Sequence, residues 1–436
     1  MQNKNVKYTI AGAAFAALIP GTAFAAVDSE TAFILNSFSF LINGALVMWM
    51  AAGFAMLEAG LVRKKNTATI CLKNIALYSV AGLTFYLVGY NLMYMDVTGF
   101  IGSLSPFWSP DDTKALAGTF DEGGYSASSD WFFQMVFVAT AASIVSGALA
   151  ERIKLWSFLG FVLLLTAIIY PIQGSWVWGG GWLDAMGFSD YAGSTLVHSV
   201  GGWAALTGAI ILGARKGKYA KDGSVLPIPG ANLPLATLGT FILWLGWFGF
   251  NGGSVLALGS AASVIEMANV FANTNMAAVG GVLSAMILTQ IIYKKVDLTM
   301  ALNGAIAGLV SITAEPADPT LGMAVLIGAV GGVIVVFAVP FLDKLKIDDV
   351  VGAISAHLFA GIWGTLAVAI SDAEASVVTQ AIGVVSIGAF VIVTSTVFWL
   401  ILKYTVGIRV DEEDEANGLD KAELGLEAYP EFGPST

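Results

Sequence analysis

Long apolar segments constrain the fold of this chain more than any other feature of its sequence. Eleven segments, most of them roughly 16 to 25 residues long, carry few or no charges, and about 20 apolar residues in a helix cross a bilayer. They cover residues 33–61, 70–90, 131–150, 155–176, 192–212, 233–250, 268–292, 298–313, 321–342, 351–370 and 379–402. With 57% hydrophobic and 12% charged residues, the chain lies outside the range of soluble domains. Because the segments are too long and too continuous for the strands of an outer-membrane barrel, the sequence predicts an all-α polytopic membrane protein with eleven transmembrane helices.

The first residues have the pattern of a secretory signal peptide. Lys4 and Lys7 precede an apolar run at 10–19, and a small-residue pattern follows that ends at Ala25. Residues 1–25 are therefore predicted to be a signal peptide, and the alternative is an uncleaved additional helix. Cleavage would leave the mature N-terminus outside and indicates a bacterial inner (plasma) membrane.

Basic residues predict which helix ends face the cytoplasm. If the chain starts outside, the cytoplasmic side receives the basic loops at 63–65, 152–154, 215–221, 294–295 and 344–346, together with the C-terminal tail. Among the basic residues of the mature loops, only Lys114 falls outside. This asymmetry is the one that the positive-inside rule describes, so a cytoplasmic C-terminus is predicted.

One motif occurs twice, each time at the start of an apolar segment. Asp190 to His198 and Asp349 to His357 both read Asp-x-x-Gly-x-x-x-x-His, and the chain has only 2 histidines. Each aspartate is expected to cap the N-terminus of its helix. Eight helical residues rise about 12 Å, so both imidazoles are expected near the middle of a hydrocarbon core about 30 Å thick.

The two copies begin on opposite sides of the membrane, and this predicts an inverted repeat of five helices in each half. The first repeat covers about 30–215 and the second about 230–371, within a membrane domain at 30–405. A peripheral eleventh helix, at about 377–405, leads to a cytoplasmic C-terminal regulatory tail at 406–436.

Three uses are open to two imidazoles at the membrane midplane. A metal site is disfavoured because no cysteine, third histidine or evident acidic cluster shares their depth, so no metal is expected. Ordinary buried histidines that satisfy a hydrogen bond remain an alternative. Ionisable groups in the middle of a membrane usually mark a transport or proton path. A neutral imidazole both donates and accepts a hydrogen bond, so we interpret the pair as a relay.

Four stretches resemble the Amt/Mep/Rh ammonium transporters, in particular the bacterial Amt type. The run 190–215 is similar to the family signature, and GALAER at 147–152, WGGG at 178–181 and GWFGFN at 246–251 are similar to further family motifs. The likeness extends from about residue 33 to the tail. It implies eleven helices, a homotrimer with one pore in each protomer, no cofactor and no enzymatic chemistry.

The resemblance also implies which residues recognise ammonium. Trp178 matches a tryptophan that lines an outer vestibule, Ser254 a serine that accepts a hydrogen bond from ammonium, and Asp190 an aspartate that supports this site from below. Nearby vestibule positions are matched by Phe133, Gln134 and Tyr170. From the residues alone, a tryptophan near a membrane interface, such as Trp178, is more often an anchor than a ligand, and the alternative for Ser254 is a hydrogen bond to its own helix.

The same resemblance assigns the pore. Phe137 and Phe250 match two stacked phenylalanines that close the vestibule floor, although core packing is the alternative, and His198 and His357 match the twin pore histidines. A bare ion costs tens of kcal/mol to bury, so neutral ammonia is expected to cross while the histidines carry hydrogen ions. Desolvation is expected to keep both imidazoles neutral on average.

The C-terminal tail and two charged residues inside the membrane segments are further features of the sequence. Residues 406–420 are similar to the family tail that meets trimeric PII signalling proteins, whereas 427–431 depart from that pattern. Glu58 and Lys73 are interpreted as a structural pair or as interface residues. The predicted function is ammonium transport across the inner membrane. The alternatives are an ammonium sensor that signals through the tail and a passive channel for neutral gases.

Overall fold

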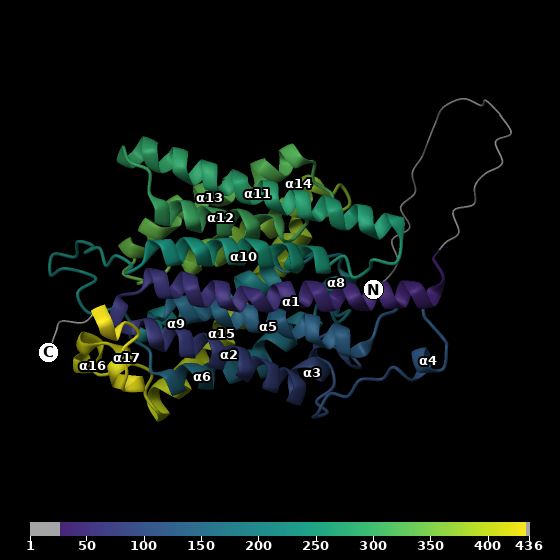
Figure 1. The fold of residues 1–436 in the computed structure, drawn as a ribbon, viewed down its shortest axis with the longest axis horizontal. Helices are drawn as coiled ribbons and strands as arrows, with labels where there is room; N and C mark the ends of the chain where they lie inside the picture. The colour runs from purple at the N-terminus through teal and green to yellow at the C-terminus, as the bar shows by residue number, and fades with distance from the viewer. Residues whose placement is uncertain (1–26, 433–436) are drawn as a thin grey trace.

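The computed structural model describes residues 27–432, and the regular elements in this range are helices, with no β-strand. The predicted signal peptide, 1–25, lies outside the described residues. Ten helical stretches in the described range are long and apolar enough to cross a membrane (Figure 1). They are α1 (Ser29–Leu61), α2 to α3 (Lys64–Tyr94), α5 (Ala127–Ala148), α6 to α7 (Leu155–Ser175), η4 with α9 (Ser194–Leu212), α10 (Leu233–Gly253), α11 (Ala261–Tyr293), α13 (Leu321–Lys344), η5 with α14 (Ile354–Ser371) and α15 (Val377–Thr405).

The eleventh predicted segment is the shorter helix α12 (Leu298–Ile312). Its 15 residues rise about 22 Å, less than the thickness of a hydrocarbon core. The loop that follows is tied to α11 because the amide nitrogen of Asn273 donates to the carbonyl oxygens of Pro316 and Pro319, at 3.0 and 2.7 Å. The fold class predicted from the sequence is therefore confirmed.

Helices in corresponding positions of the two predicted halves run antiparallel. The first helices of the halves, α1 and α10, touch backbone to backbone: a methyl group on Gly60 would lie 2.4 Å from the Ala236 nitrogen, and one on Gly239 would lie 2.3 Å from the Leu57 nitrogen. The fifth helices of the halves are α9 (Val200–Leu212) and α14 (Ala360–Ser371), each preceded by its π-helical turn. Thr195 pairs with Thr365 at 2.6 Å, so the start of one fifth helix meets the later part of the other.

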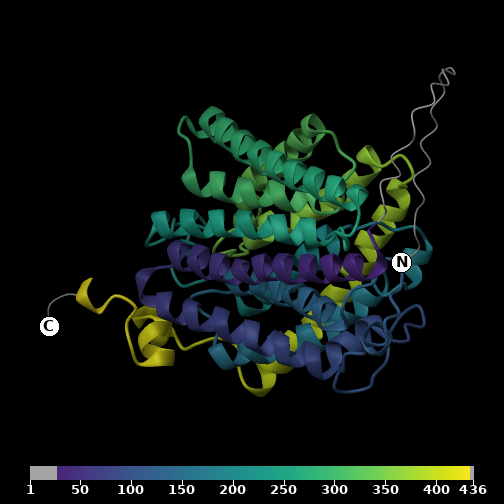
Figure 2. The ribbon, with the colours of Figure 1, turned by 45° about the vertical axis from the view of Figure 1, so that its right-hand side comes forward.

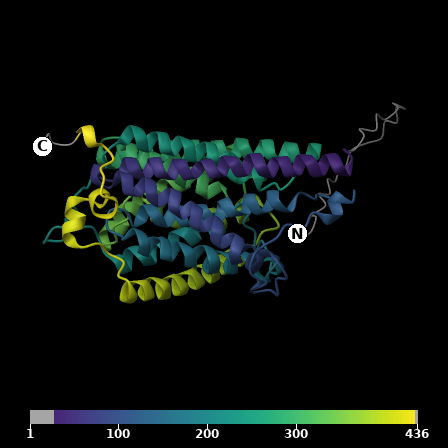
Figure 3. The ribbon, with the colours of Figure 1, turned by 60° about the horizontal axis from the view of Figure 1, so that its bottom comes forward.

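Two short helices mark one end of the bundle, which we call the tail end. These are α16 (Glu412–Asn417) and α17 (Leu419–Leu424), and they lie at this end in all three views (Figures 1, 2 and 3). At the opposite end, which we call the distal end, lie the short helices α4 (Thr113–Leu116) and α8 (Trp182–Ala185). Figure 3 shows α15, in yellow-green, along one edge of the bundle.

The tail is bound to the bundle through helix ends. The carboxylate of Asp420 accepts hydrogen bonds from the backbone nitrogens of Ala68 and Thr69, at 3.0 and 2.8 Å, at the start of α2 (Thr67–Thr84). Arg409 donates to the carbonyl oxygens of Leu212 and Ala214, at 2.9 and 2.8 Å, just past the end of α9. Free amides and carbonyls at helix ends need such partners, so the tail completes both helices.

A buried ionic network lies at the tail end. Arg215 bonds Asp348 at 2.8 and 2.9 Å and lies 3.3 Å from Glu151, which also binds Arg63 at 2.6 Å. Burial alone would raise the pKa of Glu151, but Arg215 and Arg63 hold it below its ordinary value. Each charge in the network is therefore balanced, and the loops that follow α5, α9 and α13 are fixed to one another.

Candidate functional site

His198 and His357 meet in the centre of the bundle. Their Nδ1 atoms lie 3.2 Å apart, their ring centroids 5.2 Å apart, and both side chains are buried. When both imidazoles are neutral, one Nδ1 donates a hydrogen bond and the other Nδ1 accepts it. The indole of Trp247 stacks on the His198 ring at 4.8 Å and fixes its plane.

Both histidines lie in π-helical turns, η4 (Ser194–Ser199) and η5 (Ile354–Phe359), and the aspartates of the repeated motif hold the starts of these turns. Asp190 accepts from the backbone nitrogens of Gly193, Ser194, Thr195 and Leu196, at 2.8 to 3.1 Å. Asp349 accepts from those of Ala353, Ile354 and Ser355, at 2.9 to 3.2 Å. The aspartates were predicted to be N-cap residues, but Gly193 and Ala353 occupy the cap positions. The aspartates lie three and four residues before these positions and accept from the amide groups that a wide π turn leaves free.

The glycine of the motif is required by its backbone conformation. Gly193 has φ 109° and Gly352 has φ 79°, and L side chains rarely adopt these values. These residues turn the chain into the helix directly after the aspartate. The spacing Asp-x-x-Gly-x-x-x-x-His thus encodes one local structure twice.

A cavity of about 30 Å³, which we call the vestibule, opens toward the distal side of the histidines. It is lined by Phe133, Gln134, Phe137, Trp178, Tyr191, Ser254 and Leu256. Water-sized molecules need roughly 10 to 15 Å³ each, so the vestibule holds about two of them. Five residues predicted near such a site are brought together here.

Hydrogen bonds fix two of the vestibule side chains. The indole nitrogen of Trp178 donates to the carbonyl oxygen of Asp190 at 3.0 Å, which connects the vestibule wall to the histidine motif. Ser254 donates its hydroxyl proton to the Phe250 carbonyl oxygen at 2.8 Å. Its oxygen lone pairs stay available for a donor in the vestibule.

Phe137 and Phe250 lie between the vestibule and the histidines. Their rings stack with centroids 3.9 Å apart and planes at 23°. Trp178 meets Phe137 edge to face at 6.1 Å, and Phe250 lies 5.2 Å from the His198 ring. A molecule that leaves the vestibule toward His198 must therefore displace or pass these two rings.

A second cavity lies on the other side of the histidines, and we call it the lower cavity. It measures about 10 Å³, which is room for about one water molecule. Its lining is formed by Phe54, Leu57, Glu58, Ser143, Ile144, Gly147, Asn303, Ile306, Val351, Ala353 and His357. Most of these side chains are apolar, which suits an uncharged solute better than an ion.

Two residues at this site were not predicted from the sequence. Tyr191 lines the vestibule and donates its hydroxyl proton to Glu266 at 2.8 Å, and Trp247 stacks on His198. Tyr191 follows Asp190 within the motif, which was the available signal. Tyr170, expected near the vestibule, is 1% exposed and is not part of its lining.

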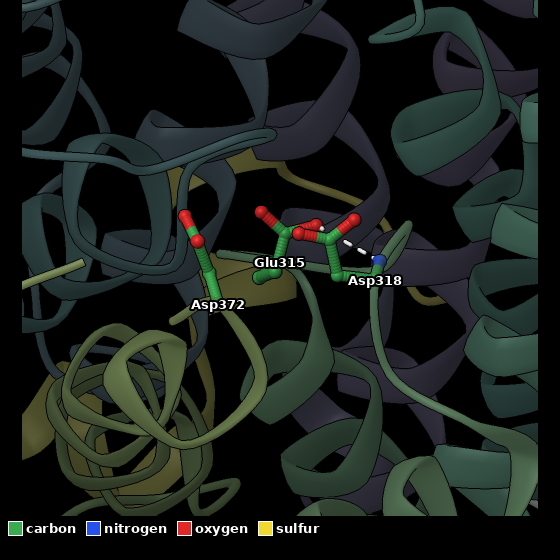
Figure 4. A group of neighbouring side chains, drawn as sticks. All are labelled: Glu315, Asp318 and Asp372. Atoms are coloured by element: carbon green, nitrogen blue, oxygen red, sulfur yellow. Dashed lines mark hydrogen bonds between the residues drawn. The ribbon is translucent and has the colours of Figure 1, made fainter. Parts of the chain in front are cut away.

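Three carboxylates at the distal end form the one metal-like cluster among residues 27–432. Glu315, Asp318 and Asp372 bring their oxygens within 4.8 Å of one another (Figure 4). One oxygen of Glu315 accepts from the backbone nitrogens of Ala317 and Asp318. Burial, with the charge of Asp318, raises the pKa of Glu315 to about 7. The cluster is thus partly neutralised by protons near neutral pH, and it shares no residue with the vestibule lining.

The fold and these cavities define a polytopic helical membrane protein with two small cavities on either side of a buried pair of histidines. The profile described as "Ammonium Transporter Family" matches residues 38–429, so the chain belongs to the ammonium transporter family. The family predicted from the sequence motifs is confirmed.

Several relatives and solved structures are similar over almost the whole chain. Ammonium transporter Amt2 of Archaeoglobus fulgidus is 42% identical over 423 residues, which cover 90% of this chain and 87% of that protein. A putative ammonium transporter of Synechocystis is 38% identical and covers 95% of both chains. Among solved structures, one described as a sensor Amt protein has a TM-score of 0.84 at 38% identity and covers 91% of this chain and 100% of its own. Candida albicans Mep2 has a TM-score of 0.80 at 26% identity, with 94% of each chain covered.

Proposed function

We propose that the protein binds ammonium in the vestibule, removes its proton near the phenylalanine pair, and lets ammonia and the hydrogen ion cross separately. One observation carries this proposal: an unbroken row of rings leads from the vestibule to the lower cavity. Neighbouring ring centroids lie 3.9 to 6.1 Å apart along the row Trp178, Phe137, Phe250, His198 and His357.

The free energies of binding and desolvation explain why the proton must leave. An aromatic face stabilises a desolvated cation by about 2 kcal/mol, and a good hydrogen bond, here to Ser254, adds about 1 kcal/mol. Burying a bare ion in an apolar medium costs tens of kcal/mol in the Born limit. The vestibule therefore recognises the ion but cannot compensate for its passage through the buried rings.

The two histidines then form the path for the hydrogen ion. An imidazole that receives a proton at one nitrogen releases one from the other, and the Nδ1 contact of 3.2 Å joins the two rings. Ammonia needs no such carrier because it is neutral. This division accounts for two ionisable side chains inside an otherwise apolar bundle.

The wider assignment follows the family and the distribution of charges. We place the distal end outside and the tail end in the cytoplasm of a bacterial cell, because the basic loops gather at the tail end. The working unit is a homotrimer with one path in each protomer. Residues 1–25 act as a cleaved signal peptide, and 406–436 as a regulatory tail.

Purified protein in liposomes on a supported membrane tests the function. An ammonium pulse is expected to evoke a current, and an equal potassium pulse is expected to evoke none. Ammonia uptake without current would favour the neutral-gas channel instead, and absence of any steady ammonium flux would favour the sensor.

The sensor alternative is favoured by one specific observation, the similarity to a structure described as a sensor Amt protein. In that case ammonium would bind at the same vestibule, and the signal would leave through the tail that Asp420 and Arg409 fix to α2 and α9. Both functions use the vestibule, so steady flux is the measurement that separates them.

Replacing Trp178 by leucine is expected to reduce the preference for ammonium over potassium at least tenfold. The variant removes the aromatic face, worth about 2 kcal/mol, and the donor to the Asp190 carbonyl oxygen. The measurement is the potassium-evoked current as a fraction of the ammonium-evoked current, which is expected to be near zero in wild type. Trp182→Leu is the matched control, because Trp182 also lies at the distal end but is absent from the vestibule lining. Equal ratios in both variants would remove Trp178 from the site.

We further propose that a PII-type signalling protein binds at the tail end. Truncation after Arg409 removes α16 and α17 but keeps the guanidinium that caps α9. The truncated protein is expected to lose the PII protein in a pull-down from proteoliposomes while it keeps its ammonium current. Retention of the partner by the truncated protein would contradict a tail-mediated contact.

A further inference from the structure

Glu58 is a buried carboxylate with one uncommitted oxygen. It lies three residues before Leu61, the last residue of α1, and is 1% exposed. Ser146 donates its hydroxyl proton to Oε2 at 2.7 Å, whereas Oε1 has no hydrogen-bond partner among residues 27–432. Asn74 is a further donor beside the carboxylate: its amide nitrogen donates one proton to the Ile70 carbonyl oxygen at 3.1 Å and keeps a second for Glu58. An uncommitted carboxylate oxygen at such depth is costly and points to a ligand.

Lys73 balances the charge of Glu58 without occupying that oxygen. Its Nζ lies 3.9 Å from Oε2, a long contact, and donates to the Ser146 carbonyl oxygen at 2.7 Å. It also lies 5.1 Å above the ring of Phe158. The lysine is therefore fixed by partners other than Glu58. The interpretation of the two residues as a pair accounts for Oε2 of the carboxylate but not for Oε1.

The lower cavity joins Glu58 to the histidine pair. Glu58 and His357 are the only two titratable residues that line it, and the volume of about 10 Å³ admits about one water molecule. Glu58 also lies nearer the tail end than the histidines, since about 4.5 Å of helix rise separates it from the end of α1.

We propose that Oε1 of Glu58 is the hydrogen-ion acceptor next in line after His357, and the last one before the solution at the tail end. This inference rests on the proposed histidine relay. In the step, the N–H bond of the His357 imidazolium breaks and an O–H bond forms at Oε1, directly or through one water. The imidazolium becomes neutral imidazole and the carboxylate becomes a neutral carboxylic acid. No atom changes its oxidation state.

Lys73 keeps the protonated state of Glu58 short-lived. Protonation of Glu58 leaves the Lys73 ammonium without a counter-ion in a buried site, which is unfavourable. Loss of the hydrogen ion restores the ion pair, and the ion gradient across the membrane sets the side on which the hydrogen ion leaves. A purely structural ion pair would not require a carboxylate that lines the same cavity as His357.

Glu58→Gln tests this role. Glutamine keeps the shape and an acceptor for Ser146 but takes up no proton at neutral pH. A second variant, Glu58→Gln/Lys73→Met, also removes the lysine charge that would otherwise lack a counter-ion. Both variants are expected to lose at least nine-tenths of the ammonium current per inserted protein while ammonia permeability, followed with a pH dye in stopped flow, stays within twofold of wild type.

Ser143→Ala is the matched control, because Ser143 lines the same cavity and has no titratable group at neutral pH. Wild-type current in either neutral variant overturns the inference. If neither neutral variant inserts into the membrane, Glu58→Asp tests the inference instead. This variant keeps the negative charge, but its shorter side chain moves the carboxylate away from the cavity by one methylene. The current is then expected to fall severalfold, and an unchanged current overturns the inference. Loss of current in the Glu58 variants but not after removal of both histidines would instead refute the relay itself.

Discussion

Liposomes that contain His198→Leu/His357→Leu protein are expected to show no ammonium-evoked current above that of empty liposomes, a loss of at least 100-fold. Leucine fills most of the imidazole volume but has neither a donor nor an acceptor, so hydrogen ions lose the path between the vestibule and the lower cavity. Ammonia permeability is expected to persist, because the leucines make the path more apolar. The two measurements together separate hydrogen-ion transfer from ammonia passage.

The single variants sharpen this test. The rings are joined through one contact, Nδ1 to Nδ1 at 3.2 Å, so His198→Leu and His357→Leu are each expected to reduce the current almost as far as the double variant. Independent buried histidines would instead give roughly additive losses. A single variant that keeps half of the wild-type current would contradict a relay through both rings.

The sequence predicts the membrane helices well because each is specified locally. An apolar run of about 20 residues has few alternatives to a helix that crosses the bilayer, since backbone groups find no other partners in lipid. Even the shorter helix α12 ends at Ile312, one residue before the predicted end, and the next membrane helix begins at Leu321 as predicted. The sequence does not show how the loop between them is held, because its partner Asn273 lies some 40 residues away.

The repeated motif predicts the centre of the site for the same reason. Asp190 and Gly193 act within a few residues of each other to shape the turn that carries His198, and the second copy does the same for His357. The two rings meet because the motif occurs twice and the two helices that carry it run in opposite directions. The sequence indicated both of these features. The roles of these residues in transport stay predictions.

The remaining contacts could not be predicted, because they join distant segments. Glu58 shares the lower cavity with His357, although they lie in the first and tenth helices, and Tyr191 reaches Glu266 in α11. The sequence showed Glu58 and Lys73 as two intramembrane charges but not the oxygen left uncommitted between them. Such features depend on side-chain orientation, which hydropathy does not encode.

Asp190→Ala is expected to have the largest effect on stability. The change leaves four buried backbone N–H groups, those of Gly193, Ser194, Thr195 and Leu196, without their acceptor. Each unsatisfied group costs about 1 to 3 kcal/mol, so the free energy of unfolding falls by about 4 kcal/mol or more. The measurement is the thermal unfolding of the protein in detergent, and a melting temperature equal to that of wild type would show that the π turn does not depend on this carboxylate.

Asp349 provides the matched control because it holds the other π turn. Asp349→Ala removes the acceptor of three backbone N–H groups and is also expected to destabilise the protein, but only the Asp190 carbonyl oxygen binds the Trp178 indole. The milder variants Asp190→Asn and Asp349→Asn therefore separate folding from recognition. Asp190→Asn is expected to raise the half-saturating ammonium concentration about tenfold, because a distorted turn moves the carbonyl oxygen that orients Trp178. Asp349→Asn is expected to leave that concentration unchanged, and an equal shift in both variants would mean that the vestibule responds to general loosening of the bundle and not to the local turn beneath it.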